Sequence, residues 1–377
     1  MNYKKKIITL VATRPDIIKL SRIINATDKF FENILVNTNQ NFNFELNEIF
    51  FKELKIKKPK YTLKSKNKKP IQNISEMLIE FEKICEIEKP DGLIVLGDTN
   101  SSLLSYVAKR KKIPIFHLEA GNRCHDQRVP EEINRKIVDH LSDINLTYSK
   151  IAKENLILEG FPEDQIFNIG SPIKEVYSFY RKKINGSKIL KNLSLVKNSF
   201  FLISFHREEN IESLEKIKDF FKFLEYLENK FNLPIIVSTH YRLQNQILKN
   251  SKLNTKTFKK VKFLKPFGYL DYCHLLNNAK VVFSDSGTIT EECSVMKFKA
   301  INLRETNERQ EGFEEGIVPM TGLNLKNIDT AINILNDKTH VPGSVKAYEA
   351  ADVSGKVIKI LISYIDYINI KVWKKFH

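Results

Sequence analysis

Short apolar runs alternate with helical patterns along the first half of the chain, and no other feature restricts the fold as much. The segments 7–12, 34–37, 93–96, 113–117 and 144–148 have the length and composition of buried strands. Patterns with helical spacing stand between them, and Pro15 and Thr13 are typical of the start of one such helix. Because strands that alternate with helices form βαβ units, we predict a parallel, doubly wound sheet.

The same alternation begins again after residue 199, with apolar runs at 200–204, 235–238, 261–264, 281–283 and 299–303. At 377 residues the chain is too long for one simple core. We therefore predict an α/β protein of two Rossmann-like, doubly wound domains that face a cleft. The predicted boundaries are 1–180 for the first domain, 181–199 for a Lys-, Asn- and Ser-rich linker, 200–355 for the second domain, and 356–377 for a C-terminal helix that braces the first.

Composition excludes several classes of protein. The apolar run near the N-terminus is too short for a signal peptide, and no stretch is long enough to span a membrane. The four cysteines lie far apart without metal-binding spacing, which favours reduced thiols. We expect a cytoplasmic protein that does not bind membranes.

The formal charge of +16 raises the question of nucleic-acid binding. The lysines are spread along the chain, however, and no recognisable nucleic-acid module accompanies them. A basic surface also suits an anionic small molecule such as a nucleotide. We expect no nucleic-acid partner, and a binding protein without catalysis would rest on the charge alone.

The segment 117–140 is rich in ionisable side chains. It reads HLEAGNRCHDQRVPEEINRKIVDH and follows a predicted buried strand, where open α/β sheets hold their ligands. Pro130 favours a helix start, so that Glu131 and Arg135 lie on one face. We expect that face to line a cleft, with the stripe of Ile133, Ile137 and Leu141 packed inward.

Three other places in the first half follow predicted strands. Arg14 and Lys19 flank a helix start, which favours an anion site but also fits an ordinary capped helix. Asp98, in GlyAspThr, can serve as a catalytic carboxylate or only as a helix cap. Glu119 follows a later strand end in the same domain, so the carboxylates of Asp98 and Glu119 can converge.

Two places in the second half resemble ligand sites. His206 follows a strand and stands beside Arg207, which is compatible with a catalytic or a structural histidine. The segment SerAspSerGlyThrIleThrGluGlu, 284–292, runs from a predicted strand into a helix. The backbone N–H and hydroxyl groups of its small polar turn favour phosphate binding. An acidic side chain one turn into the helix, Glu291 or Glu292, is placed to reach a ribose diol.

These motifs together resemble the non-hydrolysing UDP-N-acetylglucosamine 2-epimerase family over essentially the whole chain. Six of them occur in the family's order: ThrArgProAsp with Lys19, GlyAspThr, HisLeuGluAlaGly, ValProGluGluIleAsnArg, PheHisArgGlu and SerAspSerGlyThrIleThrGluGlu. The resemblance implies a glycosyltransferase-B-like fold, a homodimer and no requirement for NAD or a metal. It also implies that UDP is eliminated from C1 and C2 of the sugar and added back after the C2 proton returns on the other face. Such a reaction needs an acid, a base and cations that stabilise the departing diphosphate.

The resemblance also assigns roles to residues. Asp98, Glu119 and Glu131 correspond to the acid/base set, and Lys19 to a group that positions or polarises the sugar. Arg14, Arg135 and His206 correspond to groups that stabilise the leaving diphosphate. The UDP-binding positions are Ser286, Gly287 and Thr288 in the turn, Glu292 on the ribose and Tyr272 beside the uracil.

The string 122–140 is similar to the branch of the family that makes UDP-N-acetyl-L-fucosamine for capsule and O-antigen. It predicts UDP-2-acetamido-2,6-dideoxy-β-L-talose as the substrate, with UDP-GlcNAc and UDP-ManNAc as the alternative. Departures from the family pattern are Thr288 for the common Gly, and His240–Tyr241 for HisPro. Gln40, Asn41 and Phe42 replace the GlnHisArg that binds a second UDP-GlcNAc, so we do not expect allosteric activation. A glycosyltransferase of the same fold shares the UDP turn but does not need the three carboxylates.

Overall fold

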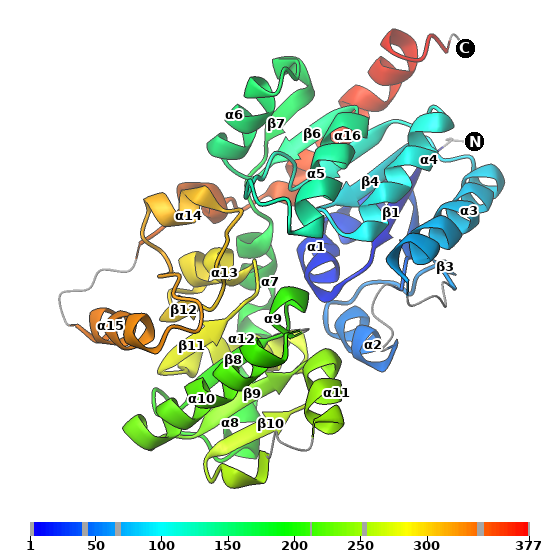
Figure 1. Cartoon of the computed structure of the whole chain (residues 1–377). Helices are drawn as coiled ribbons and strands as arrows, with labels where there is room; N and C mark the ends of the chain where they lie inside the picture. Colours follow the sequence, from blue (N-terminus) through cyan, green and yellow to red (C-terminus); the bar gives the residue numbers. More distant parts are fainter. Residues whose placement is uncertain are drawn as a thin grey trace. The chain divides into compact units, whose positions relative to one another are not determined.

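The computed structural model describes residues 4–39, 44–64, 69–211, 213–250, 255–337 and 343–375 (Figure 1). The chain divides into two compact units, each described here by itself. Unit 1 comprises Met1–Phe179 and Lys346–His377, and unit 2 comprises Tyr180–Val345. Residues 181–199, for which we expected a linker, lie within unit 2 and include the end of α7 and all of α8.

Unit 1 contains a seven-stranded parallel sheet with the order β3-β2-β1-β4-β5-β6-β7. Its direction of winding reverses between β1 and β4, which is where doubly wound sheets bind ligands. The strands are β1 (Lys6–Val11), β2 (Glu32–Asn37), β3 (Tyr61–Thr62), β4 (Gly92–Leu96), β5 (Ile115–Leu118), β6 (Ile144–Thr147) and β7 (Ile166–Asn168).

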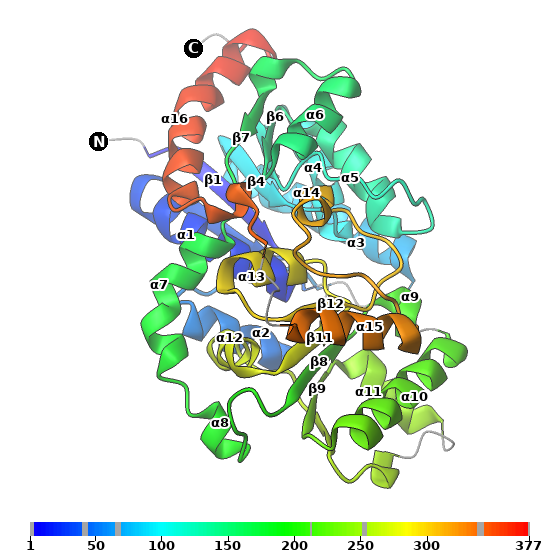
Figure 2. The same ribbon diagram turned by 90° about the vertical axis from the view of Figure 1, so that its left-hand side faces the viewer.

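Helices cover both faces of this sheet. One face packs against α3, α4 and α5 through side chains such as Phe81, Ala108 and Val138. On the other face, α16 lies beside α1 (Figure 2), and Ile365 of α16 approaches Gly92 and Ile7. The helices of unit 1 are α1 (Arg14–Phe30), α2 (Phe44–Glu53), α3 (Pro70–Glu88), the 3-10 helix η1 (Asn100–Leu104), α4 (Ser105–Arg110), α5 (Pro130–Leu141), α6 (Lys150–Leu158), most of α7 (Ile173–Asn185) and α16 (Val353–Lys371).

Unit 2 contains a five-stranded parallel sheet with the order β10-β9-β8-β11-β12, and its winding reverses between β8 and β11. Phe220 and Phe223 of α10, with Ile332 of α15, cover one face. The strands are β8 (Phe201–Phe205), β9 (Ile235–Thr239), β10 (Val261–Leu264), β11 (Val281–Ser284) and β12 (Ala300–Asn302). The helices are α8 (Ile189–Asn192), α9 (Glu208–Ile211), α10 (Leu214–Phe231), α11 (Tyr241–Lys249), α12 (Tyr269–Asn278), α13 (Ile289–Met296), α14 (Gln310–Glu314) and α15 (Leu325–Asn336).

The prediction of two doubly wound, Rossmann-like parallel sheets is confirmed. All ten predicted apolar runs overlap strands, and the run at 261–264 coincides with β10. The pattern did not reveal β3 and β7, which have two and three residues and lie at the edges of the sheet. β3 falls within a Lys-rich segment, 52–69, and residues 65–68 of that segment lie outside the described residues.

Candidate active site

The Lys19 ammonium and the Glu119 carboxylate form an ion pair in unit 1, with Lys19 Nζ 2.6 Å from Glu119 Oε2. Lys19 comes from α1, directly after β1, and Glu119 directly follows β5. The Lys19 side chain is only 2% exposed and that of Glu119 is 11% exposed. Glu119 has a φ of 65°, a left-handed conformation that costs free energy in residues with a Cβ. The fold therefore fixes this carboxylate at the end of the sheet.

Asp16 is a buried carboxylate at the same place that the motif analysis did not single out. Its Oδ2 accepts hydrogen bonds from the backbone N–H of Ala12 and Thr13, at 3.2 and 3.0 Å, and so caps α1. Burial is the main cause that raises the pKa of Asp16 to about 6, and the charge of Glu119 acts in the same direction. The spacing Thr13-x-x-Asp16 is the capping signal by which it could have been found.

Asp98 and Arg135, two predicted site residues of unit 1, form a second ion pair. Asp98 Oδ2 accepts hydrogen bonds from Arg135 Nε and Nη2, at 2.9 and 2.5 Å. The backbone carbonyl of Asp98 accepts a further bond from Asn134 Nδ2 at 2.9 Å. Asp98 follows β4 and Glu119 follows β5, and these strands are neighbours in the sheet. The structure thus brings both predicted carboxylates to adjacent strand ends, each beside a cation.

Helix α5 buries the opposite face from the one that we predicted. Ile133 and Ile137 are 51% and 43% exposed, and Leu141 is half-buried, so this stripe does not form the inward face. The charged and polar face is buried instead, because its side chains pair with the strand-end turns. The buried residues of α5 are Glu132, Asn134, Arg135, Val138 and Asp139.

Glu132, the neighbour of the predicted Glu131, pairs with Arg135 inside this helix. Glu132 Oε2 lies 2.9 Å from Arg135 Nη1, and the carboxylate also accepts hydrogen bonds from the backbone N–H of Cys124 and His125. The Glu132 residue is fully buried, whereas Glu131 is half-buried in the first turn of α5. The periodicity of the sequence could not show which of these two adjacent glutamates is buried.

The segment between β5 and α5, which carried the narrower substrate prediction, is held by internal ion pairs. Arg123 donates to Asp139 Oδ2 at 2.8 Å and to both carboxylate oxygens of Glu159, at 2.7 and 2.5 Å. The hydrogen bonds of Cys124 and His125 to Glu132 add to this support. Arg123 and Glu132 thus serve the local fold of the segment.

In unit 2, the predicted residue His206 lies beside a buried carboxylate, Asp285. Asp285 follows β11, which neighbours β8, and accepts hydrogen bonds from the backbone N–H of His206 and Arg207 and from Asn210 Nδ2. Its Oδ1 lies 3.0 Å from His206 Nδ1. Burial opposes ionisation, but the charge and hydrogen bond of His206 and the other donors lower the pKa of Asp285 to about 2. Asp285 therefore orients the His206 ring through Nδ1.

The turn at 286–288 and the start of α13 have the geometry of an anion site. Ser286 Oγ lies 3.0 Å from Thr288 Oγ1, and Thr288 Oγ1 donates to Glu292 Oε1 at 3.1 Å. Ser286, Thr288 and Glu292 are half-buried, while Glu291 is fully buried and pairs with Arg309. Of the two glutamates left open by the sequence, Glu292 lies beside the turn.

An arginine cluster that we did not predict lies behind Gly287. A Cβ at this position would lie 2.5 Å from Glu308 Oε1, 2.9 Å from Arg309 Nη1 and 3.3 Å from Arg207 Nη2. Glu308 also pairs with Arg304 at 2.7 Å. Arg207, Arg304 and Arg309 pair with the carboxylates of Glu308 and Glu291, and three guanidinium groups behind the turn favour an anionic ligand there.

Two further predicted residues, Arg14 and Tyr272, lie at the starts of helices. Arg14 is the half-buried first residue of α1, and Tyr272 is half-buried in the first turn of α12. His240 follows β9, and its ring centroid lies 6.0 Å from that of His206. The predicted loss of the allosteric site rests on residues 40–42, which lie outside the described residues.

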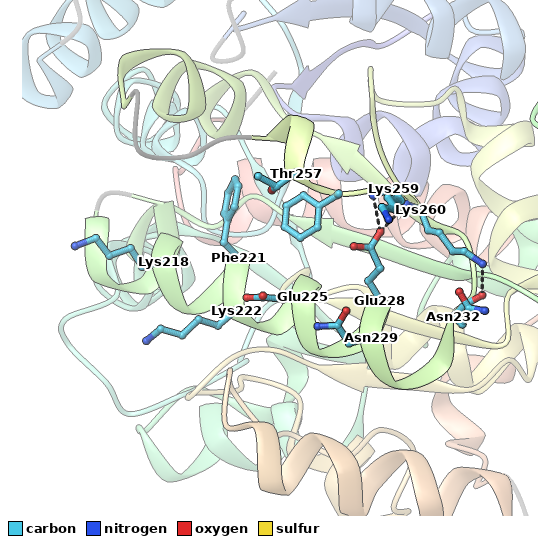
Figure 3. A pocket seen from close by; sticks show the side chains of 11 residues that line it. Lys218, Phe221, Lys222, Glu225, Glu228, Asn229, Asn232, Thr257, Lys259 and Lys260 are labelled. Atoms are coloured by element: carbon cyan, nitrogen blue, oxygen red, sulfur yellow. Dashed lines mark hydrogen bonds between the residues drawn. The ribbon is translucent and has the colours of Figure 1, made fainter.

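A groove of about 750 Å³ lies elsewhere in unit 2, on α10 and the segment 257–260 (Figure 3). Glu228 accepts hydrogen bonds there from the backbone N–H of Lys259 and Lys260. None of the predicted site residues lines this groove. In the part of the chain that the structure describes, no group of three His, Cys, Asp or Glu side chains is placed to hold a metal, and no helix is long and apolar enough to cross a membrane.

The two units carry different kinds of functional groups. Unit 1 presents carboxylates beside buried cations, an arrangement suited to proton transfer next to an anionic group. Unit 2 presents hydroxyl and N–H groups before a cationic cluster, an arrangement suited to a phosphate ligand. Both sets lie at the ends of strands next to the point where the winding of their sheet reverses.

Comparison with known proteins agrees with this chemistry. The family model described as UDP-N-acetylglucosamine 2-epimerase matches residues 24–362. The UDP-N-acetylglucosamine 2-epimerase of Methanocaldococcus jannaschii is 35% identical over 88% of this chain and 93% of its own. The UDP-2,3-diacetamido-2,3-dideoxy-D-glucuronate 2-epimerase of Pseudomonas aeruginosa is 32% identical over 80% of this chain and 84% of its own.

Solved structures show the same likeness. That of a UDP-N-acetylglucosamine 2-epimerase from Rickettsia bellii has a TM-score of 0.90 and 42% identity, and covers 99% of this chain and 100% of that one. The M. jannaschii enzyme in complex with UDP-GlcNAc and UDP has a TM-score of 0.88 and 34% identity, and covers 95% of this chain and 99% of that one.

Proposed function

Because the chain belongs to the UDP-N-acetylglucosamine 2-epimerase family, a family of isomerases, we propose that it inverts C2 of a UDP-N-acetylhexosamine by eliminating UDP and adding it back. The C2 proton of such a sugar is not adjacent to a carbonyl, so its direct removal is slow. Elimination avoids an unstabilised carbanion, because loss of the C2 proton to a base is coupled to departure of UDP from C1 and leaves an unsaturated 2-acetamidoglycal. Return of the proton on the other face, followed by re-addition of UDP, inverts C2.

The observation that carries this proposal is the pair of carboxylate–cation contacts at adjacent strand ends of unit 1. Asp98 with Arg135 and Glu119 with Lys19 supply two carboxylates that can exchange protons with the sugar, and Glu131 is the third member of the proposed acid/base set. The nearby cations stabilise the anions that form when UDP departs. A glycosyltransferase has no need of this set.

We further propose that unit 2 binds the UDP portion of the substrate. The hydroxyl groups of Ser286 and Thr288 and the positive cluster behind Gly287 suit a diphosphate. Glu292, beside Thr288, is assigned to the ribose, and Tyr272 to the uracil. His206, oriented by Asp285, and Arg14 of unit 1 are assigned to the leaving diphosphate.

For the sugar, we propose UDP-GlcNAc, in exchange with UDP-ManNAc, as the first candidate. It is the substrate named for the M. jannaschii relative. The talose derivative remains the second candidate, because the string 122–140 resembles the branch that uses it. Several residues of that string, such as Arg123 and Glu132, form internal ion pairs and hydrogen bonds, however. This weakens the argument that the string recognises the sugar. With the talose derivative, the product would be UDP-N-acetyl-L-fucosamine, a precursor for capsule or O-antigen.

The test is incubation with each UDP-sugar in deuterium oxide, followed by NMR of the anomeric and C2 signals. Deuterium at C2 of a product with inverted C2 supports the proposal, and the preferred sugar is the one with the larger kcat/KM. The Glu119→Gln variant should lose turnover, whereas Glu163→Gln, on the surface of unit 1, should retain it. Sugar transfer to an acceptor without deuterium at C2 would instead indicate a glycosyltransferase, and steady release of free sugar would indicate a hydrolase.

We also propose that the protein forms a homodimer through unit 1. Three neighbouring helices expose large apolar side chains to solvent: Ile79 of α3, Tyr106 of α4, and Ile133 and Ile137 of α5. Their exposure is not explained by the fold of a single chain, since α5 is buried through its charged face. A second copy that covers these side chains would remove apolar area from water.

Sedimentation velocity at several concentrations tests the dimer. Wild type should sediment as a dimer, and Ile133→Asp should shift the distribution to the monomer while the circular dichroism spectrum stays unchanged. Ile157→Asp on α6 is a matched control, because Ile157 is also exposed but lies outside these three helices. A monomeric wild type would contradict the proposal.

A further inference from the structure

The hydroxyl group of Thr288 lies between the phosphate turn of unit 2 and the carboxylate assigned to the ribose. Thr288 Oγ1 is 3.0 Å from Ser286 Oγ, and it donates to Glu292 Oε1 at 3.1 Å. All three residues are half-buried. The family pattern commonly has glycine where this chain has Thr288, so the resemblance assigns no role to this hydroxyl.

Thr288 does not use its hydroxyl to cap helix α13, although it stands at the N-cap. An N-cap threonine ordinarily accepts a hydrogen bond from a backbone N–H two or three residues later. Thr288 makes no such bond, and its backbone is already helical, with a φ of −78° and a ψ of −11°. The N–H of Glu292 donates to the Thr288 carbonyl at 2.9 Å, so Glu292 lies one turn later on the same face of the helix. The local backbone thus brings the hydroxyl and the carboxylate together.

The number of available hydrogens fixes the direction of the two side-chain bonds. A threonine hydroxyl has one hydrogen, and that of Thr288 points at Glu292 Oε1. Thr288 can then only accept in its contact with Ser286, so the Ser286 hydroxyl is the donor. Ser286 Oγ in turn accepts from the backbone N–H of Thr288 at 3.4 Å. Both hydroxyl hydrogens therefore point toward the carboxylate, and donors aligned in this way strengthen one another.

We propose that Thr288 is a positioning residue, which holds the Glu292 carboxylate for the ribose of the substrate and ties it to the turn that binds the diphosphate. The proposal rests on the proposed binding of UDP by unit 2. A glutamate side chain that becomes ordered only when the ligand arrives loses rotamer freedom, and this loss weakens binding. Because Thr288 orders the carboxylate beforehand, the ribose hydroxyl groups gain more from it. Thr288 thereby increases the preference of the site for ribonucleotides over their deoxy counterparts.

A purely structural role of Thr288 predicts a different result. If its side chain only filled space in the turn, its loss would weaken the binding of every ligand that has a diphosphate. If Thr288 acts through Glu292, its loss weakens the binding of UDP more than that of an analogue without the ribose hydroxyl that Glu292 binds. The ratio of the two dissociation constants separates these cases, because an effect on the diphosphate cancels in it.

Isothermal titration calorimetry with UDP, 2′-deoxy-UDP and 3′-deoxy-UDP measures this ratio. For wild type we expect the Kd of at least one deoxy analogue to exceed that of UDP by about tenfold or more, because a hydrogen bond to a charged group is lost. In Thr288→Val, which keeps the shape but lacks the hydroxyl, the ratio should fall to about threefold or less. Thr288→Ser keeps the hydroxyl and should keep the ratio within about twofold of wild type. Thr330→Val is the matched control, because it removes an exposed hydroxyl that donates to the Lys326 carbonyl on α15.

A double-variant cycle tests whether Thr288 acts through Glu292. Thr288→Val alone should raise the Kd for UDP by about threefold to tenfold. In a Glu292→Gln background, the same substitution should change that Kd by less than about twofold, because the carboxylate that Thr288 holds is already absent. An equally large effect in both backgrounds would overturn the proposal, and so would a ratio in Thr288→Val equal to that of wild type.

The calorimetric and NMR assays fail in different ways for the two proposals. A protein that binds UDP with a Thr288-dependent ratio but epimerises neither UDP-sugar would contradict the epimerase and support the positioning role. An active epimerase whose ratio does not depend on Thr288 would contradict the positioning role alone. Equal Kd values for UDP and both deoxy analogues in wild type, or no binding of UDP at all, would overturn the role assigned to Thr288.

Discussion

Lys19 Nζ lies 2.6 Å from Glu119 Oε2, although 100 residues separate them in the sequence. The two residues follow β1 and β5, and β4 lies between these strands in the sheet. Neighbouring strands are about 4.8 Å apart, so β1 and β5 are about 10 Å apart. The side chains of Lys19 and Glu119 bridge this distance over the end of β4. Asp98 leaves the sheet at that end. The ion pair thus defines one side of the place where we propose that the sugar binds.

We expect Glu119→Gln to destabilise the protein as well as to inactivate it. The substitution removes the charge that the Lys19 ammonium faces in a nearly closed site, and breaking a buried ion pair costs about 3 kcal/mol. The double variant Lys19→Met/Glu119→Gln removes both charges, so it should regain most of the free energy of unfolding but no activity. Urea unfolding and the NMR assay measure the two effects. A Glu119→Gln variant as stable as wild type would show that the pair is not closed to solvent.

The effect of Asp16→Asn on stability should depend on pH. Because the folded-state pKa of Asp16 is raised from 3.8 to about 6, the folded protein retains a proton between these values that the unfolded chain has released. The carboxyl therefore makes the wild type progressively less stable as pH rises through this window. An amide does not titrate, so Asp16→Asn should gain about 2 kcal/mol relative to wild type between about pH 4.5 and pH 7.5.

Asp126→Asn is the matched control for this pH series. The pKa of Asp126 is lowered to about 2 by hydrogen bonds from Arg128, so its window lies below pH 4. Its stability difference from wild type should stay constant between the two pH values. Thermal unfolding at both pH values measures both variants, and a constant difference for Asp16→Asn as well would contradict the raised pKa.

Glu131→Gln and Glu132→Gln should affect different properties of the protein. Glu132 is fully buried against Arg135 and two backbone N–H groups, so its neutralisation should lower the free energy of unfolding by about 3 kcal/mol. Glu131 is half-buried, and Glu131→Gln should change stability by less than about 0.5 kcal/mol while it lowers kcat as a member of the acid/base set. Denaturant titration with the kinetic assay separates the two. Equal stability losses would show that both glutamates support the helix.

Gly287→Ala should weaken UDP binding. The new methyl group would lie 2.5 Å from Glu308 Oε1 and 2.9 Å from Arg309 Nη1, so the buried ion pair behind the turn must move. We expect the Kd for UDP, measured by isothermal titration calorimetry, to rise by about tenfold or more, which corresponds to roughly 1.4 kcal/mol. Gly186→Ala is the control, because its Cβ would meet the nearest atom, the Lys182 carbonyl oxygen, at an ordinary 3.5 Å. Unchanged UDP affinity in Gly287→Ala would show that this turn is not part of the UDP site.

The sequence by itself determined where ten of the twelve strands in the described residues lie, and that they form two parallel sheets. Runs such as 281–283 are apolar because central strands of a parallel sheet are buried on both faces, and that signal is local. The order of motifs likewise placed Asp98, Glu119, His206 and the turn at 286–288 after strands. Because the parallel strands of one sheet end at a common edge, the residues of each unit could be grouped separately without coordinates.

Only the tertiary structure decided which partner each side chain has. The pattern of α5 shows an apolar stripe and a charged stripe, but burial depends on what faces the helix, and here strand-end turns bury Glu132, Arg135 and Asp139. The same reason explains why Asp16 and Asp285 were missed. A single carboxylate after a strand looks alike in sequence whether it caps a helix or orients a histidine. Its role comes from donors elsewhere along the chain, as Arg123 is for Asp139.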